Sequence, residues 1–169
     1  HLIKLGIKNI NVALGYKAEK IISSLQKYKN IKFTFYKVKN YRNVGSSYSW
    51  YLFKNIWENK KKSLIVMHAD IFYNYKLLKQ IINSKKNDLI GSVLKNKGQI
   101  KIDGWIIEND QKNLIKKIKK KRNKQETQKR EVACINKFSP HSMKYIFNFM
   151  KIFFLKRGKN YTWEILLNE

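Results

Sequence analysis

The chain has 169 residues, a length that fits one domain with a core large enough to need no disulfide staple. Its single cysteine excludes an internal disulfide framework and a multi-cysteine zinc set, and no apolar run is long and clean enough to span a bilayer. We therefore expect a cytoplasmic protein without membrane insertion. The sequence leaves the oligomeric state undefined.

The formal net charge of +26 is typical of proteins that bind nucleic acid or other anions. Nearly all of it comes from Lys, whereas base readout and bidentate phosphate contacts favour Arg. Lys, Asn and Ile are abundant together and share A/T-rich codons, so a biased genome explains the charge. A basic nucleic-acid-binding module without catalysis stays open as an alternative, with residues 112–130 as its surface, but we expect no specific nucleic acid partner.

The opening residues up to Gly6 are typical of the last turn of a helix and its stop. A domain rarely begins at such a point. We therefore expect a single domain over residues 1–169 that is incomplete at its N-terminus, because a preceding strand and loop are absent.

The first part of the chain alternates apolar runs with amphipathic stretches. The runs predict strands at residues 10–14, 31–38, 63–69 and 89–94. The amphipathic stretches predict helices at residues 18–28, 47–57 and 75–83. Strands that alternate with helices in this way are typical of a parallel sheet.

The second part changes character. Residues 99–102 and 105–108 flank Asp103-Gly104, a dipeptide that favours a tight hairpin turn. A strand at residues 114–118 and a basic loop follow, then a strand at 132–138 and helices at 140–155 and 161–167. The sequence thus predicts an α/β fold with a mixed, mainly parallel Rossmann-like sheet, flanking helices and an antiparallel hairpin extension.

Asp70 is the leading candidate for a functional residue because it follows the apolar run Leu64 to Met67. Such a run indicates a strand buried on both faces, and ligands of open α/β sheets bind beyond the carboxyl ends of the strands. Asp70 could hold a Mg²⁺–phosphate complex there. An Asp that caps the following helix explains the local pattern equally well.

Small polar residues precede the helix at 47–57 and could present backbone N–H groups to a phosphate or a base edge. These nucleotide-binding candidates are Asn43, Gly45, Ser46, Ser47 and Ser49. A serine-capped helix without a ligand explains the same pattern.

Several aromatic residues could form a box around a quaternary ammonium group, although aromatic side chains more often belong to the core. The candidates are Trp105, Tyr161, Trp163 and Tyr73. Glu131 heads the strand at 132–138 and faces either the substrate or a neighbouring Lys. Core positions are favoured for His68 and for the single cysteine, Cys134.

The order of these motifs resembles the nucleotidyltransferases that join a nucleoside triphosphate to a sugar phosphate or an alcohol phosphate. The opening KLGIKNINVALGYKAEKI is similar to the second strand and following helix of that family. NVGSSYSW, HAD, WIIENDQKNLIKKI and YTWEILLNE are similar, in order, to four further segments of bacterial choline-phosphate cytidylyltransferases. The family's Gly-rich nucleotide loop would lie upstream of His1.

The resemblance implies Mg²⁺-dependent transfer of a nucleotidyl group, with CTP as the expected nucleotide and pyrophosphate as the leaving group. The acceptor would be phosphocholine or a sugar phosphate, in the synthesis of cell-surface polysaccharide or lipid precursors. Asp70 would be catalytic, Asp70 and Glu164 would hold the metal, and Trp105 would meet the substrate head group. Glu164 departs from the Asp that is more usual in the family. The base and the acceptor are not determined by the sequence.

Overall fold

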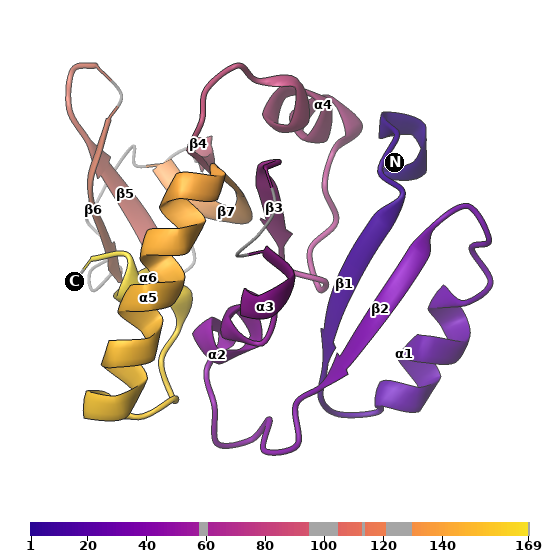
Figure 1. The fold of residues 1–169 in the computed structure, drawn as a ribbon. Helices are drawn as coiled ribbons and strands as arrows, with labels where there is room; N and C mark the ends of the chain where they lie inside the picture. The colour runs from indigo at the N-terminus through magenta and orange to yellow at the C-terminus, as the bar shows by residue number, and fades with distance from the viewer. Residues whose placement is uncertain (58–60, 95–104, 113, 121–129, 169) are drawn as a thin grey trace.

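The computed structural model describes residues 1–57, 61–94, 105–112, 114–120 and 130–168 (Figure 1). The strands are β1 (Asn9–Leu14), β2 (Lys32–Lys37), β3 (Leu64–Met67), β4 (Leu89–Leu94), β5 (Trp105–Asn109), β6 (Ile115–Lys120) and β7 (Arg130–Phe138). The helices are α1 (Ala18–Leu25), α2 (Ser46–Tyr51), α3 (Lys54–Trp57), α4 (Tyr75–Asn83), α5 (Pro140–Arg157) and α6 (Trp163–Leu166), after a 3₁₀ turn at Ile3–Leu5.

Strands β1 and β2 form a small parallel sheet, with α1 as the crossover between them (Figure 1). The register runs from Asn9 opposite Lys32 to Leu14 opposite Lys37. Gly6 ends the opening 3₁₀ turn at a φ of 77°, a left-handed conformation that glycine adopts without strain. The predicted βαβ unit at the start of the chain is confirmed.

Strand β7 lies at the centre of the larger sheet, and each strand that pairs with it is antiparallel to it. Asn136 and Lys137 pair with β3 on one edge and with β4 on the other. The first residues of β7 pair with β5, and β5 pairs in turn with β6. The strand pair expected from the WIIENDQKNLIKKI segment is therefore present as β5 and β6.

The prediction of a mainly parallel sheet is wrong for the described residues, in which β1 and β2 are the parallel pair. Strands β3 and β4 do run in the same direction with α4 between them, as the alternation indicated. The antiparallel strand β7, from much later in the chain, lies between them. Hydrophobic periodicity identifies strands but not their neighbours in the sheet, so the pattern could not show this insertion.

The larger sheet is covered on both faces. Helix α5 runs across one face with α2 and α6 beside it, and its buried Met143, Phe147 and Met150 form the centre of the main core (Figure 1). On the other face α4 packs Leu78 and Ile81 against the strands. Side chains of β3, an edge strand of this sheet, alternate between the two cores, and each of them is partly buried.

Other predicted elements differ at their ends. The expected helix over 47–57 is divided into two short helices, α2 and α3. At the break the Phe53 backbone N–H donates to the carbonyl of Trp50, three residues earlier, instead of four residues earlier as in an α-helix. The Asp103-Gly104 turn, the strand at 99–102 and most of the basic loop lie outside the described residues. In the described part of the chain, no helix has the length and apolar character needed to cross a membrane.

Candidate active site

Asp70 lies in the turn that follows β3, and its side chain is exposed. The carboxylate does not cap the next helix. Asn74 is the N-cap of α4, and its side chain accepts a hydrogen bond of 2.8 Å from the backbone N–H of Lys76. The capping explanation for Asp70 is thereby removed, and the carboxylate remains available to a ligand.

The start of α2 holds the C-terminal segment against the sheet. The Ser47 hydroxyl, which is fully buried, donates to the carbonyl oxygen of Tyr161 at 2.6 Å, and the Ser46 hydroxyl accepts from the backbone N–H of Trp163. A Cβ atom at Gly45 would lie 2.0 Å from that same Tyr161 oxygen, so the two backbones approach more closely than any side chain allows. Of the expected nucleotide-binding residues, Gly45, Ser46 and Ser47 therefore position α6. Asn43 is exposed and Ser49 is half-buried.

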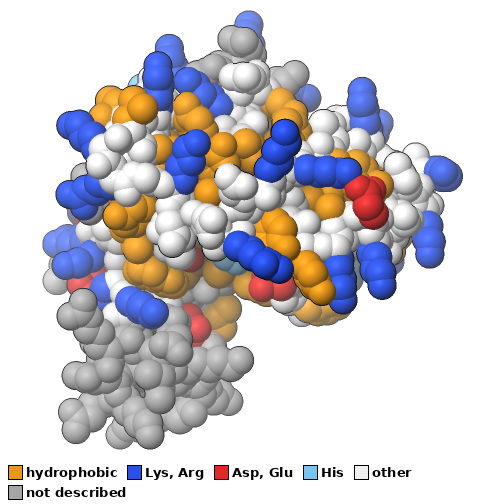
Figure 2. Space-filling model, turned by 90° about the horizontal axis from the view of Figure 1, so that it is seen from below, with side chains coloured by type: hydrophobic (Ala, Val, Ile, Leu, Met, Phe, Trp, Pro, Cys, Tyr) orange, Lys and Arg blue, Asp and Glu red, His pale blue; other side chains and the backbone are white. Residues whose placement is uncertain are grey.

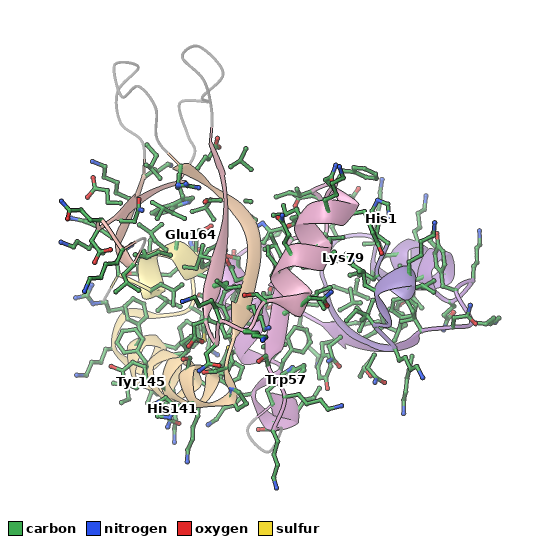
Figure 3. All side chains as sticks on the ribbon, turned by 90° about the horizontal axis from the view of Figure 1, so that it is seen from above. His1, Trp57, Lys79, His141, Tyr145 and Glu164 are labelled. Atoms are coloured by element: carbon green, nitrogen blue, oxygen red, sulfur yellow. The ribbon has the colours of Figure 1, made fainter. Side chains whose placement is uncertain are left out.

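Helix α6 places Glu164 between α5 and the larger sheet (Figure 3). The side chain is 3% exposed, and burial raises the pKa of its carboxyl above the usual value. The neighbouring Trp163 is fully buried and stacks on Trp50, so it belongs to the core and offers no ring face to a ligand. Its indole Nε1–H instead donates to Nε2 of His68 at 3.2 Å.

Cys134 lies at a bulge in β7 and has a φ of 52°, a left-handed conformation that is strained for a residue with a side chain. Two hydrogen bonds hold its carbonyl oxygen in place. The His68 backbone N–H donates to it at 3.1 Å, and the Tyr73 hydroxyl donates at 2.7 Å. Gly91, on the facing strand, makes room, since a Cβ atom there would lie 2.7 Å from Ile135.

These elements bring His68, Cys134 and Glu164 together: one ligand atom from each lies within 4.8 Å of the others. The pKa of the Cys134 thiol is raised to about 11, mainly by burial and to a smaller extent by the negative charges of Glu164, Asp70 and Glu131. The same negative potential extends to Tyr73, whose pKa burial raises to about 12, with a smaller contribution from Asp70. Carboxylates from the turn after β3, from β7 and from α6 thus contribute negative potential at Cys134, although the chain is strongly basic.

The acids at this point fit a hard divalent cation. Mg²⁺ is held in proteins by one or two carboxylates together with phosphate oxygens and water. An exposed Asp70 and a buried Glu164 provide such oxygens from two elements, and a bound cation would offset the desolvation of the Glu164 carboxylate. Among the described residues, Asp70 is not part of the group of ligand atoms within 4.8 Å of one another that includes Glu164, so their joint role in holding a metal stays a prediction.

The remaining candidates lie farther along the sheet. Trp105 begins β5 and Tyr161 precedes α6, and both are partly buried against the main core. The Tyr161 ring contacts Phe153 edge-on at 4.9 Å between ring centroids. Glu131 is half-buried in β7 opposite Ile106 of β5.

Sequence analysis missed the roles of His68, Cys134 and Tyr73, which it assigned to the core or to an aromatic box. A cysteine inside an apolar run gives no sign of a bulge. The one signal available was Gly91 within a predicted strand, since glycine inside a strand often marks a bulge or a close approach.

Solved structures with the same fold are nucleotidyltransferases. The CTP:phosphocholine cytidylyltransferase of Streptococcus pneumoniae matches 99% of this chain at 17% identity, with a TM-score of 0.73. The inositol-1-phosphate CTP transferase of T. maritima matches 99% at 14% identity (TM-score 0.75), and a UDP-glucose pyrophosphorylase complexed with UDP-glucose matches 98% at 12% identity (TM-score 0.72).

The matched region spans 66%, 63% and 70% of those three proteins. Neither a protein-family model nor the sequence of a curated protein matches the chain. The resemblance indicated by the sequence motifs is therefore confirmed as a likeness of fold: this is an α/β chain with the fold of nucleotidyltransferases.

Proposed function

We propose that the chain carries the metal and acceptor side of a Mg²⁺-dependent nucleotidyltransferase. The reaction would transfer a nucleotidyl group from a nucleoside triphosphate to a phosphorylated small molecule and release pyrophosphate. The observation that supports this most is the nucleotidyltransferase fold, in which an exposed and uncapped Asp70 follows β3 and a buried Glu164 lies at the start of α6.

In such a reaction a phosphate oxygen of the acceptor forms a bond to the α-phosphorus of the triphosphate, and the bond from that phosphorus to the leaving pyrophosphate breaks. The protein contributes positioning and charge neutralisation. Asp70 and Glu164 would hold Mg²⁺, which neutralises charge on the phosphate groups when bound. The Lys-rich surface would attract both anionic substrates.

The chain's own residues divide into two groups. Ser46 and Ser47 fix α6, and the Trp163 indole orients the His68 ring, so these side chains position Glu164 and its surroundings. Asn43 and Ser49 remain as candidates for contact with the nucleotide, and Trp105, Glu131 and Tyr161 for contact with the acceptor.

CTP and phosphocholine are the specific substrates we propose. The sequence motifs resemble choline-phosphate cytidylyltransferases, and two of the structures of like fold are named as enzymes that use CTP. An indole face such as that of Trp105 attracts a quaternary ammonium group, whereas sugar hydroxyls need hydrogen-bond partners that it does not provide. A sugar phosphate is the second choice of acceptor.

The test is an assay of pyrophosphate release by the purified protein. CTP, UTP, GTP and ATP are each paired with phosphocholine, inositol 1-phosphate and glucose 1-phosphate, with and without Mg²⁺. We expect release to be fastest with CTP and phosphocholine and to require Mg²⁺. Faster release with glucose 1-phosphate would identify a sugar phosphate, rather than phosphocholine, as the acceptor. No release with any pair would contradict the transferase function.

A further inference from the structure

His68, Cys134 and Glu164 form a second set of metal ligands beside the proposed magnesium carboxylates. The three residues come from the end of β3, the bulge of β7 and the start of α6, and their ligand atoms lie within 4.8 Å of one another. Two atoms bound tetrahedrally to one zinc ion stand roughly 3.6 Å apart. The cluster would therefore need to close by about 1 Å, within the reach of side-chain rotation.

The donor types distinguish this cluster from a magnesium site. An imidazole nitrogen, a thiolate sulfur and a carboxylate oxygen together suit Zn²⁺, and three protein ligands leave a fourth position open. Mg²⁺ requires oxygen ligands in octahedral geometry and does not favour the sulfur. A thiol next to a histidine and a buried carboxylate is not needed for nucleotidyl transfer.

Charge also favours a cation here. Glu164, Asp70 and Glu131 all act on the Cys134 thiol with negative potential, although the chain as a whole carries a net charge of +26. Binding of a dication would replace the thiol proton, which leaves to solvent as the sulfur–metal bond forms. The thiol itself is partly accessible.

The backbone fixes the spacing of two ligands in advance. The bulge holds Cys134 in a left-handed conformation with its side chain on the main-core side of β7, and the His68 backbone N–H donates to the Cys134 carbonyl. Metal binding would break one contact. His68 Nε2 now accepts a hydrogen bond from the Trp163 indole. If a metal binds Nε2, the lone pair of that atom is used, and if a metal binds Nδ1, Nε2 carries the ring proton. In both cases Nε2 no longer accepts from the indole.

We propose that His68, Cys134 and Glu164 bind Zn²⁺ or another thiophilic divalent cation in tetrahedral coordination. The site shares Glu164 with the proposed magnesium site, so Zn²⁺ would compete with Mg²⁺ for that carboxylate if the proposed function holds. The zinc site itself does not depend on that function.

The probe is Co²⁺, titrated into the untagged 169-residue protein while the near-ultraviolet absorption is recorded. We expect a thiolate-to-cobalt charge-transfer band that Zn²⁺ abolishes at equimolar concentration and that a large excess of Mg²⁺ leaves intact. Cys134→Ser should lose the band. His68→Gln and Glu164→Gln should each weaken Zn²⁺ binding at least tenfold, as measured by competition with a chromophoric chelator.

His141→Gln is the matched control, because His141 is exposed on α5 (Figure 3). It should leave the band and the affinity unchanged. Absence of the band from the wild-type protein would overturn the proposal, and so would a Zn²⁺ affinity that neither His68→Gln nor Glu164→Gln alters. Circular dichroism confirms the fold of each variant. Because no step measures pyrophosphate release, the result is independent of the transferase assay.

Discussion

At the scale of single residues, Cys134 carries the most unusual chemistry. It is the only cysteine of the chain, so its alkylation can be followed without interference. Its pKa is raised from 9.0 to about 11, and the thiolate is the reactive form. At pH 8 we expect the folded protein to react with iodoacetamide about 100-fold more slowly than the urea-unfolded chain, since each pKa unit changes the thiolate fraction tenfold.

The same shift has a consequence for stability. The folded chain holds the thiol proton more tightly than the unfolded chain, so the free energy of unfolding falls as the pH rises from about 9 to about 11. Cys134→Ser should remove this part of the pH dependence. A rate profile for alkylation of the folded protein with a midpoint near pH 9 would contradict the assigned environment.

Substitution of Trp105 tests whether phosphocholine is the acceptor. If phosphocholine binds over its indole ring, Trp105→Ala removes a cation–π contact of roughly 1–2 kcal/mol and raises the KM for phosphocholine about tenfold. The KM for CTP should stay nearly unchanged. Both KM values and the melting temperature of the variant are measured. Equal effects on both substrates with a large loss of stability would assign Trp105 to the core alone.

Single residues differed in how far the sequence revealed them. Asp70 was named because it follows the apolar run of β3, and the structure leaves it exposed and uncapped, while its role in holding a metal stays a prediction. Ser47 was predicted to bind the nucleotide, yet its hydroxyl donates to the carbonyl of Tyr161, 114 residues later in the chain. A local sequence pattern cannot reveal a contact over that separation. Cys134 was assigned to the core because it lies in the apolar run Val132 to Ile135, and such a run does not reveal a positive φ.

At the scale of elements, the contact between the start of α2 and the segment before α6 positions Glu164. Gly45→Ala should disrupt it, since the added Cβ would lie 2.0 Å from the Tyr161 carbonyl oxygen. We expect the free energy of unfolding to fall by about 3 kcal/mol, at the upper end for overpacking because the neighbour is backbone. Urea denaturation measures this change.

Gly6→Ala provides the matched control. Gly6 has a positive φ, but a Cβ atom there meets nothing within 4 Å, so the substitution should cost about 1 kcal/mol from backbone strain alone. Equal losses for the two variants would show that the α2–α6 contact is unimportant.

The elements themselves were largely predictable, and their pairing was not. The apolar run of β3 and the Asn74-capped α4 were recognisable from local patterns. The position of β7 between β3 and β4 depends on strand pairs that are far apart in the sequence, such as Leu64 with Phe138 and Leu89 with Lys137, which hydrophobic periodicity does not encode.

At the scale of the whole molecule, the distribution of charge decides between the two classes of function. Figure 2, which views the molecule from below, shows the Lys and Arg side chains of the described residues scattered over this face rather than gathered in one stripe. We expect only weak binding to single-stranded or duplex nucleic acid, lost near physiological salt, because scattered phosphate contacts dissociate steeply as salt rises. A fluorescence anisotropy titration at several salt concentrations measures this. Tight, salt-resistant binding with sequence preference would favour the nucleic-acid alternative.

The most direct test of the proposed site is Mg²⁺-dependent pyrophosphate release by the Asp70→Asn and Glu164→Gln variants of the protein. Each variant removes one negatively charged metal ligand and keeps the shape of the side chain. Turnover should therefore fall by at least about 100-fold, the effect typical of removing one group that stabilises charge in a transition state. Glu19→Gln, on the exposed surface of α1, should retain wild-type turnover. Near-normal turnover of Asp70→Asn at limiting Mg²⁺ would contradict the account.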